Sequence, residues 1–229
     1  MTRLSFAASA AAAVATALLM SSPVPAADDP STTGTGTGAA APAAVEVAPG
    51  ITRERLEQAV AAAWKNLPPD LAARVVQDET MALCSQYRNQ PPQAVADAIL
   101  AREKQNVTYP ADGKYLGSWK NGEKLALSGF GGRMGDNPKQ ANGGNCYACH
   151  QLAPTEISYG TLGPSLLGYG KLKGTTPEAQ KEVYERVFNA QAVFACSNMP
   201  RFGHNKFLTI EQIKDAVAFL LDPDSPVNK

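Results

Sequence analysis

The sequence has no excess charge of either sign and, after its N-terminal region, no long run of apolar residues. It contains 21 lysine and arginine residues against 21 aspartate and glutamate residues. A balanced chain lacks the basic surface that attracts nucleic acid or an anionic membrane. A membrane-spanning helix needs about 20 consecutive apolar residues, and no segment after residue 26 provides them. We therefore expect neither nucleic-acid binding nor a membrane span.

Runs typical of β-strands are also lacking, whereas helical patterns recur. Between residues 50 and 105, apolar residues fall at helical spacing, and proline pairs at 68–69 and 91–92 separate three expected helices. Trp64 and Met81 are expected in the core there. Thr52 and, further along, Ser118, Thr176 and Thr209 stand at positions typical of helix N-caps. The patterns predict an all-α fold, with a helical extension over residues 50–105 and a second domain over residues 106–229.

The first 26 residues are typical of a secretory signal peptide. Arg3 supplies a positive start, an alanine-rich apolar stretch follows, and small residues precede a cleavage point after Ala26. No twin-arginine pair is present. Residues 27–49 are rich in threonine, glycine, alanine and proline, a composition that cannot bury a core, so we expect a disordered linker. The sequence therefore predicts export, and the periplasm is the expected location.

Histidine and cysteine are scarce, with two and four residues respectively, yet three of these six stand together. The segment Cys146-Tyr147-Ala148-Cys149-His150 is C-x-x-C-H, the attachment motif of a c-type haem. Two thiols at this spacing can each add to one vinyl group of the same haem, and the adjacent imidazole can bind the iron. We therefore expect one covalently bound haem c, held by Cys146 and Cys149, with His150 as an axial iron ligand.

Two other chemistries use a C-x-x-C pair. A redox dithiol is expected where a strand leads into a helix, and no strand pattern surrounds this motif. A zinc site needs two further ligands, and the spacing of the remaining candidates matches no finger or ribbon. A secreted metal-binding module without haem is the resulting alternative.

Cys84 and Cys196 are the two cysteines outside the haem motif, and they can pair with each other. An exported chain reaches an oxidising compartment, where such a pair is expected to form a disulfide. A bridge closing a loop of more than one hundred residues could stabilise the fold by roughly 4–5 kcal/mol. The alternative is two buried thiols.

A haem iron held by one histidine needs a second axial ligand or an open site. Met199 lies in a loop between the last two expected helices, where a mono-haem cytochrome c presents its distal methionine. His204 is the main rival, and Met134 and Met81 are further candidates. We expect Met199 to be the second ligand.

A proline in the loop over residues 161–167 has an expected role beside the haem motif. A ligating imidazole usually donates its free N–H to an acceptor that holds the ring in position. In cytochromes c a proline carbonyl accepts this bond, and Pro164 stands in the corresponding loop. We therefore expect a hydrogen bond between His150 and Pro164. The segment can also be an ordinary turn, and the two interpretations are compatible with each other.

The segments on both sides of the haem motif resemble SoxX, the mono-haem cytochrome subunit of SoxAX thiosulfate-oxidising complexes. The resemblance rests on residues 117–124 (GSWKNGEK), 143–151 (GGNCYACHQ), 198–203 (NMPRFG) and 208–215 (LTIEQIKD), and it covers about residues 107–222. It implies a class I-like cytochrome c domain over residues 106–229. The part before it is similar to the extension of the longer members.

The resemblance also implies a role and partners. SoxAX complexes couple thiosulfate oxidatively to a cysteine of the carrier SoxYZ, an L-cysteine S-thiosulfotransferase activity whose reactive haem belongs to SoxA. A SoxX-like chain forms a heterodimer with a SoxA-like cytochrome and relays electrons to a soluble cytochrome, and it carries no catalytic residue itself. A free-standing periplasmic electron carrier, or the haem subunit of another oxidoreductase, is the alternative.

Overall fold

The computed structural model describes residues 46–48, 50–72, 75–133, 135–137 and 139–229. The described residues are helical apart from one short strand pair, so the predicted all-α class is confirmed. The α-helices are α1 (Arg53–Ala63), α2 (Pro69–Ala72), α3 (Glu79–Gln86), α4 (Gln93–Gln105), α5 (Trp119–Leu127), α6 (Tyr169–Lys173), α7 (Pro177–Phe188) and α8 (Ile210–Leu221). Three short 3-10 helices are η1 (Cys146–Ala148), η2 (Ala190–Ala192) and η3 (Pro226–Asn228).

The strand pair is a feature that the sequence does not predict. β1 (Glu46–Ala48) pairs antiparallel with β2 (Ile51–Thr52). Gly50 between them has a φ of +74°, a left-handed conformation that glycine adopts without strain. β1 lies at the end of the segment 27–49, which is predicted to be a linker. The rest of that linker and the signal peptide lie outside the described residues.

Threonine side chains begin three of the helices as predicted. Thr52, Thr176 and Thr209 each accept a hydrogen bond from a backbone N–H in the first turn of α1, α7 and α8. These N–H groups have no acceptor within the helix, so the caps stabilise the helix starts. Ser118 precedes α5 as expected, but its side chain makes no capping hydrogen bond. Its backbone N–H instead donates to the Asp215 carboxylate at 2.7 Å.

The region predicted as a helical extension matches the prediction only in part. α4 follows the second proline pair as expected, but the single helix predicted between the two proline pairs is divided into α2 and α3. No residue of α1 is buried. Trp64 is 52% exposed and Met81 is 39% exposed. The prediction that these two side chains belong to the core is therefore wrong.

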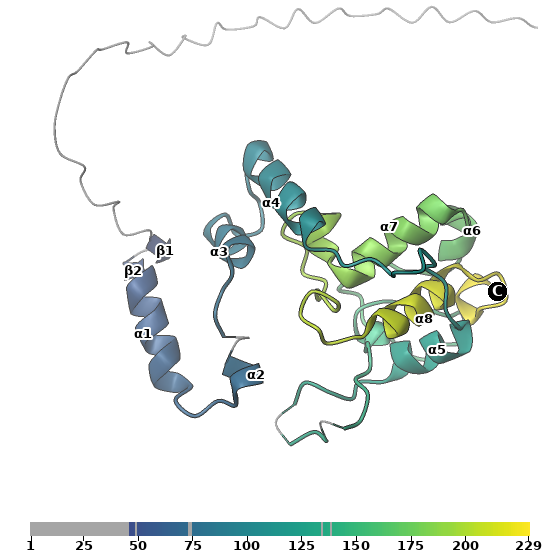
Figure 1. Cartoon of the computed structure of the whole chain (residues 1–229), viewed down its shortest axis with the longest axis horizontal. Helices are drawn as coiled ribbons and strands as arrows, with labels where there is room; N and C mark the ends of the chain where they lie inside the picture. Colours follow the sequence, from purple (N-terminus) through teal and green to yellow (C-terminus); the bar gives the residue numbers. More distant parts are fainter. Residues whose placement is uncertain (1–45, 49, 73–74, 134, 138) are drawn as a thin grey trace, which may run out of the picture. The chain divides into compact units, whose positions relative to one another are not determined.

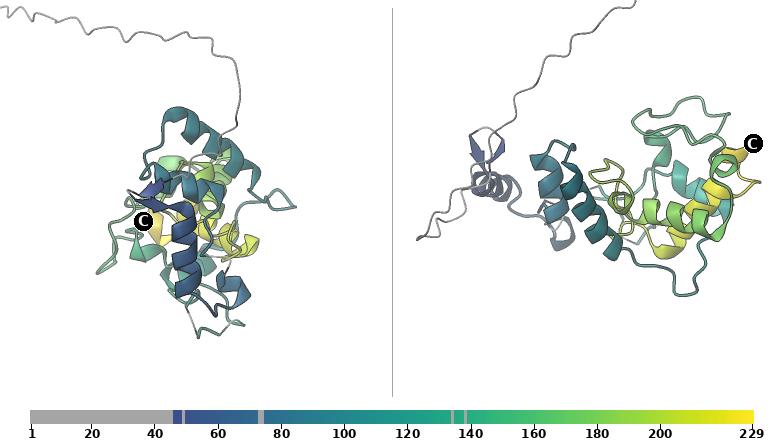
Figure 2. Two further views of the ribbon diagram at one scale, coloured as in Figure 1. Left: turned by 90° about the vertical axis from the view of Figure 1, so that its left-hand side faces the viewer. Right: turned by 90° about the horizontal axis from the view of Figure 1, so that it is seen from above.

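The core of the C-terminal part is arranged around α8. This helix contacts α5, α6 and α7 (Figure 1, Figure 2). α5 approaches α8 closely at Gly122, where an added Cβ would lie 2.1 Å from the backbone oxygen of Asp215. Glycine is therefore required at this crossing. The largest cluster of buried side chains joins α7 and α8 and includes Val183, Tyr184, Val187, Phe188, Ile213, Val217 and Leu221.

The helices of the described residues are short. The longest of them, α4, has 13 residues. None of the described helices combines the length and the apolar character that a membrane crossing requires.

Candidate functional site

The haem-type motif is folded into a single tight turn. The backbone oxygen of Cys146 accepts hydrogen bonds from Cys149 N–H at 3.1 Å and from His150 N–H at 2.9 Å. Asn145, just before the turn, has a φ of +50°, a left-handed conformation that asparagine tolerates better than most residues. The turn brings the two thiols and the imidazole to the wall of one cavity.

The loop after the motif is fastened to it by backbone hydrogen bonds. Gly160 N–H donates to Tyr147 O at 2.9 Å, and Gly163 N–H donates to Cys149 O at 2.8 Å. A Cβ at Gly163 would lie 2.3 Å from the Cε1 atom of His150. Glycine therefore allows the loop to pass directly against the imidazole ring.

The predicted contact between His150 and Pro164 is present. The Nδ1 atom of His150 lies 2.7 Å from the Pro164 carbonyl oxygen. Because a carbonyl only accepts, Nδ1 carries the proton in this bond and Nε2 is left as the free, lone-pair nitrogen. The imidazole is therefore held in the tautomer that a metal ligand needs.

One large cavity brings the predicted site residues together. It has a volume of about 1100 Å³, and its walls include Cys146, Cys149, His150, Pro164 and Met199. Much of the remaining wall is apolar, with contributions from Leu166, Tyr169, Val183, Val187, Phe202 and Leu220. Small-molecule sites usually enclose roughly 300–1,000 Å³, so the cavity has room for a large planar ligand.

Met199 is the candidate second ligand that shares this cavity with His150. It lies in the irregular segment between η2 and α8, is partly buried, and packs against the core cluster of α7 and α8. Its backbone N–H donates to the Ser197 hydroxyl at 3.2 Å. The four side chains predicted to hold a haem, from residues 146, 149, 150 and 199, thus face a common space.

The rival ligands lie elsewhere or outside the described residues. His204 does not line the cavity, and its Nε2 atom lies 3.9 Å from the Asp78 carboxylate. Burial, assisted by the Arg201 guanidinium, lowers the pKa of His204, so this ring is neutral at pH 7. Met81 is on α3 and receives a contact from the Gln191 side-chain amide at 3.7 Å. Met134 is not among the described residues.

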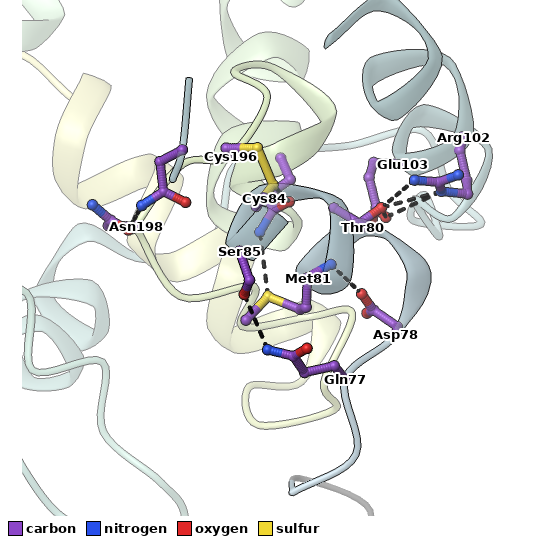
Figure 3. Close-up of a disulfide and its surroundings, with 12 residues drawn as sticks. Gln77, Asp78, Thr80, Met81, Cys84, Ser85, Arg102, Glu103, Cys196 and Asn198 are labelled. Atoms are coloured by element: carbon purple, nitrogen blue, oxygen red, sulfur yellow. Dashed lines mark hydrogen bonds and ion pairs between the residues drawn. A yellow bond between two sulfur atoms is a disulfide. The ribbon is translucent and has the colours of Figure 1, made fainter. Parts of the chain in front are cut away.

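The remaining cysteines form the predicted disulfide. Cys84 and Cys196 are bridged across a sequence separation of 112 residues (Figure 3). Neither cysteine is therefore available as a ligand for the alternative zinc site. In the described part of the chain, no group of three or more His, Cys, Asp or Glu side chains is placed to hold a metal ion. Cys146 and Cys149 are free thiols.

The environment of Cys146 does not suit a redox dithiol. Burial raises the pKa of its thiol to about 12. A reactive dithiol needs a lowered pKa, because the thiolate is the nucleophile. The Cys146 side chain is packed beside Leu125, Ala126 and Leu152, which form an apolar recess of the same wall.

A buried polar network beside the site is not apparent from the sequence. The Glu103 carboxylate on α4 accepts hydrogen bonds from the Thr80 hydroxyl, from the Asn189 amide at 2.7 Å and from the Arg201 guanidinium at 3.4 Å. Arg201 also donates to Asp78 at 2.5 Å. Glu103 has the pattern of an ordinary helical surface residue, so no signal in the sequence identifies its partners.

Comparison with known proteins gives one informative relative. No protein-family model matches the chain. An uncharacterized lipoprotein of Aquifex aeolicus (strain VF5) is 39% identical over 191 residues, which cover 81% of this chain and 86% of the Aquifex protein. Identity of this extent over most of both chains means a shared family. The chain belongs to the same family as this Aquifex lipoprotein.

Proposed function

We propose that this protein is a c-type cytochrome that relays electrons as a subunit of an oxidoreductase. The observation that supports this function is the convergence of two thiols, one oriented imidazole and one thioether on a single cavity. These are the groups that a covalently bound haem with His/Met ligation requires. Residues 106–229 are then a class I-like cytochrome c domain.

The cavity also contains a group that fits the acidic edge of a haem. Arg186 lines the cavity, and its buried Nε atom has no hydrogen-bond partner among the described residues. One of its terminal nitrogens lies 3.4 Å from Glu182. A buried N–H without an acceptor is costly, and a guanidinium pairs well with a carboxylate. A haem propionate supplies such a carboxylate.

Each site residue then has a separate task. Cys146 and Cys149 attach the cofactor, and the Pro164 carbonyl holds the His150 ring with Nε2 available for iron. The Met199 thioether is a soft ligand that favours the reduced metal and raises the reduction potential. A bound haem supplies a one-electron couple. His150 and Met199 would both hold the iron, so the chain would transfer electrons and would make no bonds in a substrate.

The resemblance to SoxX suggests which reaction these electrons come from. We propose a heterodimer with a SoxA-like cytochrome that couples thiosulfate to a cysteine of a SoxYZ carrier, and transfer onward to a soluble cytochrome. An extracytoplasmic location is supported by the disulfide, since such bonds persist in oxidising compartments, and by the name of the Aquifex relative. Within that description, the periplasm is the proposed compartment.

The test of the haem is optical. The purified protein is expected to keep its colour after denaturation and acid–acetone extraction, because a thioether-bound haem cannot be extracted. The ferric form is expected to show the near-infrared band of methionine–iron ligation. Met199→Ala should abolish that band and lower the reduction potential, whereas the matched variant His204→Ala should keep it. A colourless, zinc-containing protein would exclude the proposed function.

The partner is tested by purification from the native source. A stable complex with a second haem-bearing subunit supports the SoxAX-type assignment. A monodisperse monomer with the same spectrum supports the free-standing electron carrier instead. The two outcomes share every haem property, so only the assembly state separates them.

A further inference from the structure

The segment around Met199 is tied to α3, α4 and their flanking residues at three points. Cys196, three residues before Met199, is bonded to Cys84 on α3. Asn198, directly before it, accepts a hydrogen bond from the Asn89 side chain at 3.2 Å. Figure 3 shows the disulfide and Asn198 on the same side of α3.

The third tie is ionic and lies two residues after Met199. Arg201 is buried and donates to Asp78 at 2.5 Å and to Glu103 at 3.4 Å. Glu103 is itself buried and is the acceptor for Thr80 and Asn189 as well. Asp78 N-caps α3, where its carboxylate accepts from Met81 N–H at 2.8 Å. The guanidinium therefore links the Met199 segment to the start of α3 and to the end of α4.

Apart from the packing of the Met199 side chain against the core cluster, the residues directly beside it have few other anchors. Asn198 and Pro200 on either side of Met199 are exposed, and the Met199 N–H is bonded only within its own loop. Cys196 has a φ of +59°, a left-handed conformation that is unfavourable for a residue with a side chain. Such a conformation persists only when surrounding contacts impose it, and the disulfide is one such contact.

We infer that the segment from Asp78 to Glu103 is a positioning clamp, which holds the Met199 loop so that the thioether faces the cavity that His150 also lines. Cys84, Cys196 and Arg201 are positioning residues in this account. The inference rests on the proposed function, because it treats Met199 as the distal ligand of a haem iron. The clamp gives a role to the helical extension, for which the resemblance to SoxX implies none.

The clamp makes a prediction about ligand exchange at the iron. An external ligand such as imidazole binds only when Met199 has moved away, so its apparent affinity rises with the fraction of molecules in the open state. Loosening the loop should raise that fraction. We expect the Kd for imidazole to fall about tenfold or more when the disulfide or the Arg201 ties are removed.

The experiment uses the full-length ferric holoprotein and imidazole as the probe. The variants are Cys84→Ala/Cys196→Ala and Arg201→Gln, with Arg201→Lys as the conservative replacement. Both disruptive variants should bind imidazole more tightly and weaken the near-infrared methionine–iron band, and Arg201→Lys should restore part of each signal. If Arg201→Gln does not fold, Asp78→Asn serves in its place, because the amide oxygen keeps the helix cap while the ion pair is lost.

A matched control separates the clamp from general destabilisation. Tyr109→Phe removes a hydrogen bond of 2.7 Å to Glu185 on α7 and leaves all three ties to the Met199 segment intact. Its imidazole affinity and near-infrared band should equal those of the wild type. An equal change in Tyr109→Phe and in the clamp variants would overturn the inference.

The remaining outcomes are also decisive. If the wild type has the near-infrared band and every clamp variant binds imidazole with wild-type affinity, the inference fails and the proposed function stands. If the wild type carries no haem, or carries haem without the methionine–iron band, the assignment of Met199 fails and the clamp with it. Tighter imidazole binding confined to the clamp variants supports the inference.

Discussion

Two parts of the same predicted extension behave differently in the structure. α1 has a helical apolar stripe and a threonine cap, yet none of its residues is buried. α3 and α4 have no stronger pattern, yet they contain the buried residues Cys84, Ile99 and Glu103. Together with the residues that flank them, they provide all the ties to the Met199 segment. The difference teaches that periodicity predicts a helix, whereas burial depends on specific partners elsewhere in the chain.

The largest effect that this comparison predicts comes from the disulfide. Cys84→Ala/Cys196→Ala is expected to lower the free energy of unfolding by about 4–5 kcal/mol, because the bridge restricts a very long loop in the unfolded chain. Urea denaturation of the holoprotein measures the change. Wild-type protein treated with a dithiol reductant should lose a similar amount. A loss below about 1 kcal/mol in both would show that α3 is held without the bridge.

Removal of the buried apolar side chain of α4 should have the next largest effect. Ile99 is 0% exposed and packs against the two disulfide cysteines. Ile99→Ala leaves a cavity in this small cluster and is expected to cost about 2–5 kcal/mol. The change is measured by the shift of the urea midpoint at constant slope. Wild-type stability in this variant would mean that α4 is attached through its polar network alone.

Acid should weaken the α3 end of the clamp by a smaller amount. Burial lowers the pKa of His204 in the folded protein, so the unfolded chain binds more protons and stability falls as pH drops through the ordinary histidine range near 6.5. Partial burial raises the pKa of Asp78, but hydrogen bonds from Met81 N–H and Arg201 outweigh it and hold it below its usual range. The contribution of Asp78 to the stability of the fold is lost at a lower pH than that of His204, when the Asp78 carboxylate becomes protonated.

The pH prediction has a direct control. The melting temperature of the wild type should fall between pH 7 and pH 5, and that of His204→Gln should fall less. The remaining loss below pH 4 should be shared by both proteins, since it reflects carboxylates. Identical profiles from pH 7 to pH 5 would show that His204 is accessible to protons in the folded state.

The smallest effect is expected in α1. Trp64 is largely exposed, so Trp64→Ala should change the free energy of unfolding by no more than about 0.5 kcal/mol. This substitution removes more side-chain surface than Ile99→Ala, which makes the pair a sharp test of the contrast between α1 and α4. A decrease in the free energy of unfolding of more than about 2 kcal/mol would show that the Trp64 side chain is buried by a contact that the described residues do not make.

Helix starts were predictable because capping is local chemistry. A threonine and the N–H groups two or three residues later are neighbours in any helix, so Thr52, Thr176 and Thr209 could be identified without a fold. Ser118 shows the limit of this reasoning. Its cap position was predicted correctly, but its N–H is bonded to Asp215, and that acceptor is 97 residues away.

The candidate site likewise has a part that is local in the sequence and a part that depends on remote residues. The C-x-x-C-H motif is a five-residue pattern, and the contact of His150 with Pro164 spans 14 residues. Met199 could be proposed from its place between two helices. The Arg201–Glu103 contact spans 98 residues, and neither residue has a local signal that points to the other. The hypothesis of a clamp therefore required the structure.

The sequence by itself determined the chemistry that lies close together along the chain: the paired thiols with their adjacent imidazole, the threonine caps and the all-α class. The tertiary structure decided which helices bury their apolar faces and which side chains surround Met199. The physical reason is distance along the chain. Short-range spacing is set by covalent geometry and by the turn of a helix, whereas burial and buried ion pairs arise only when remote segments exclude water between them.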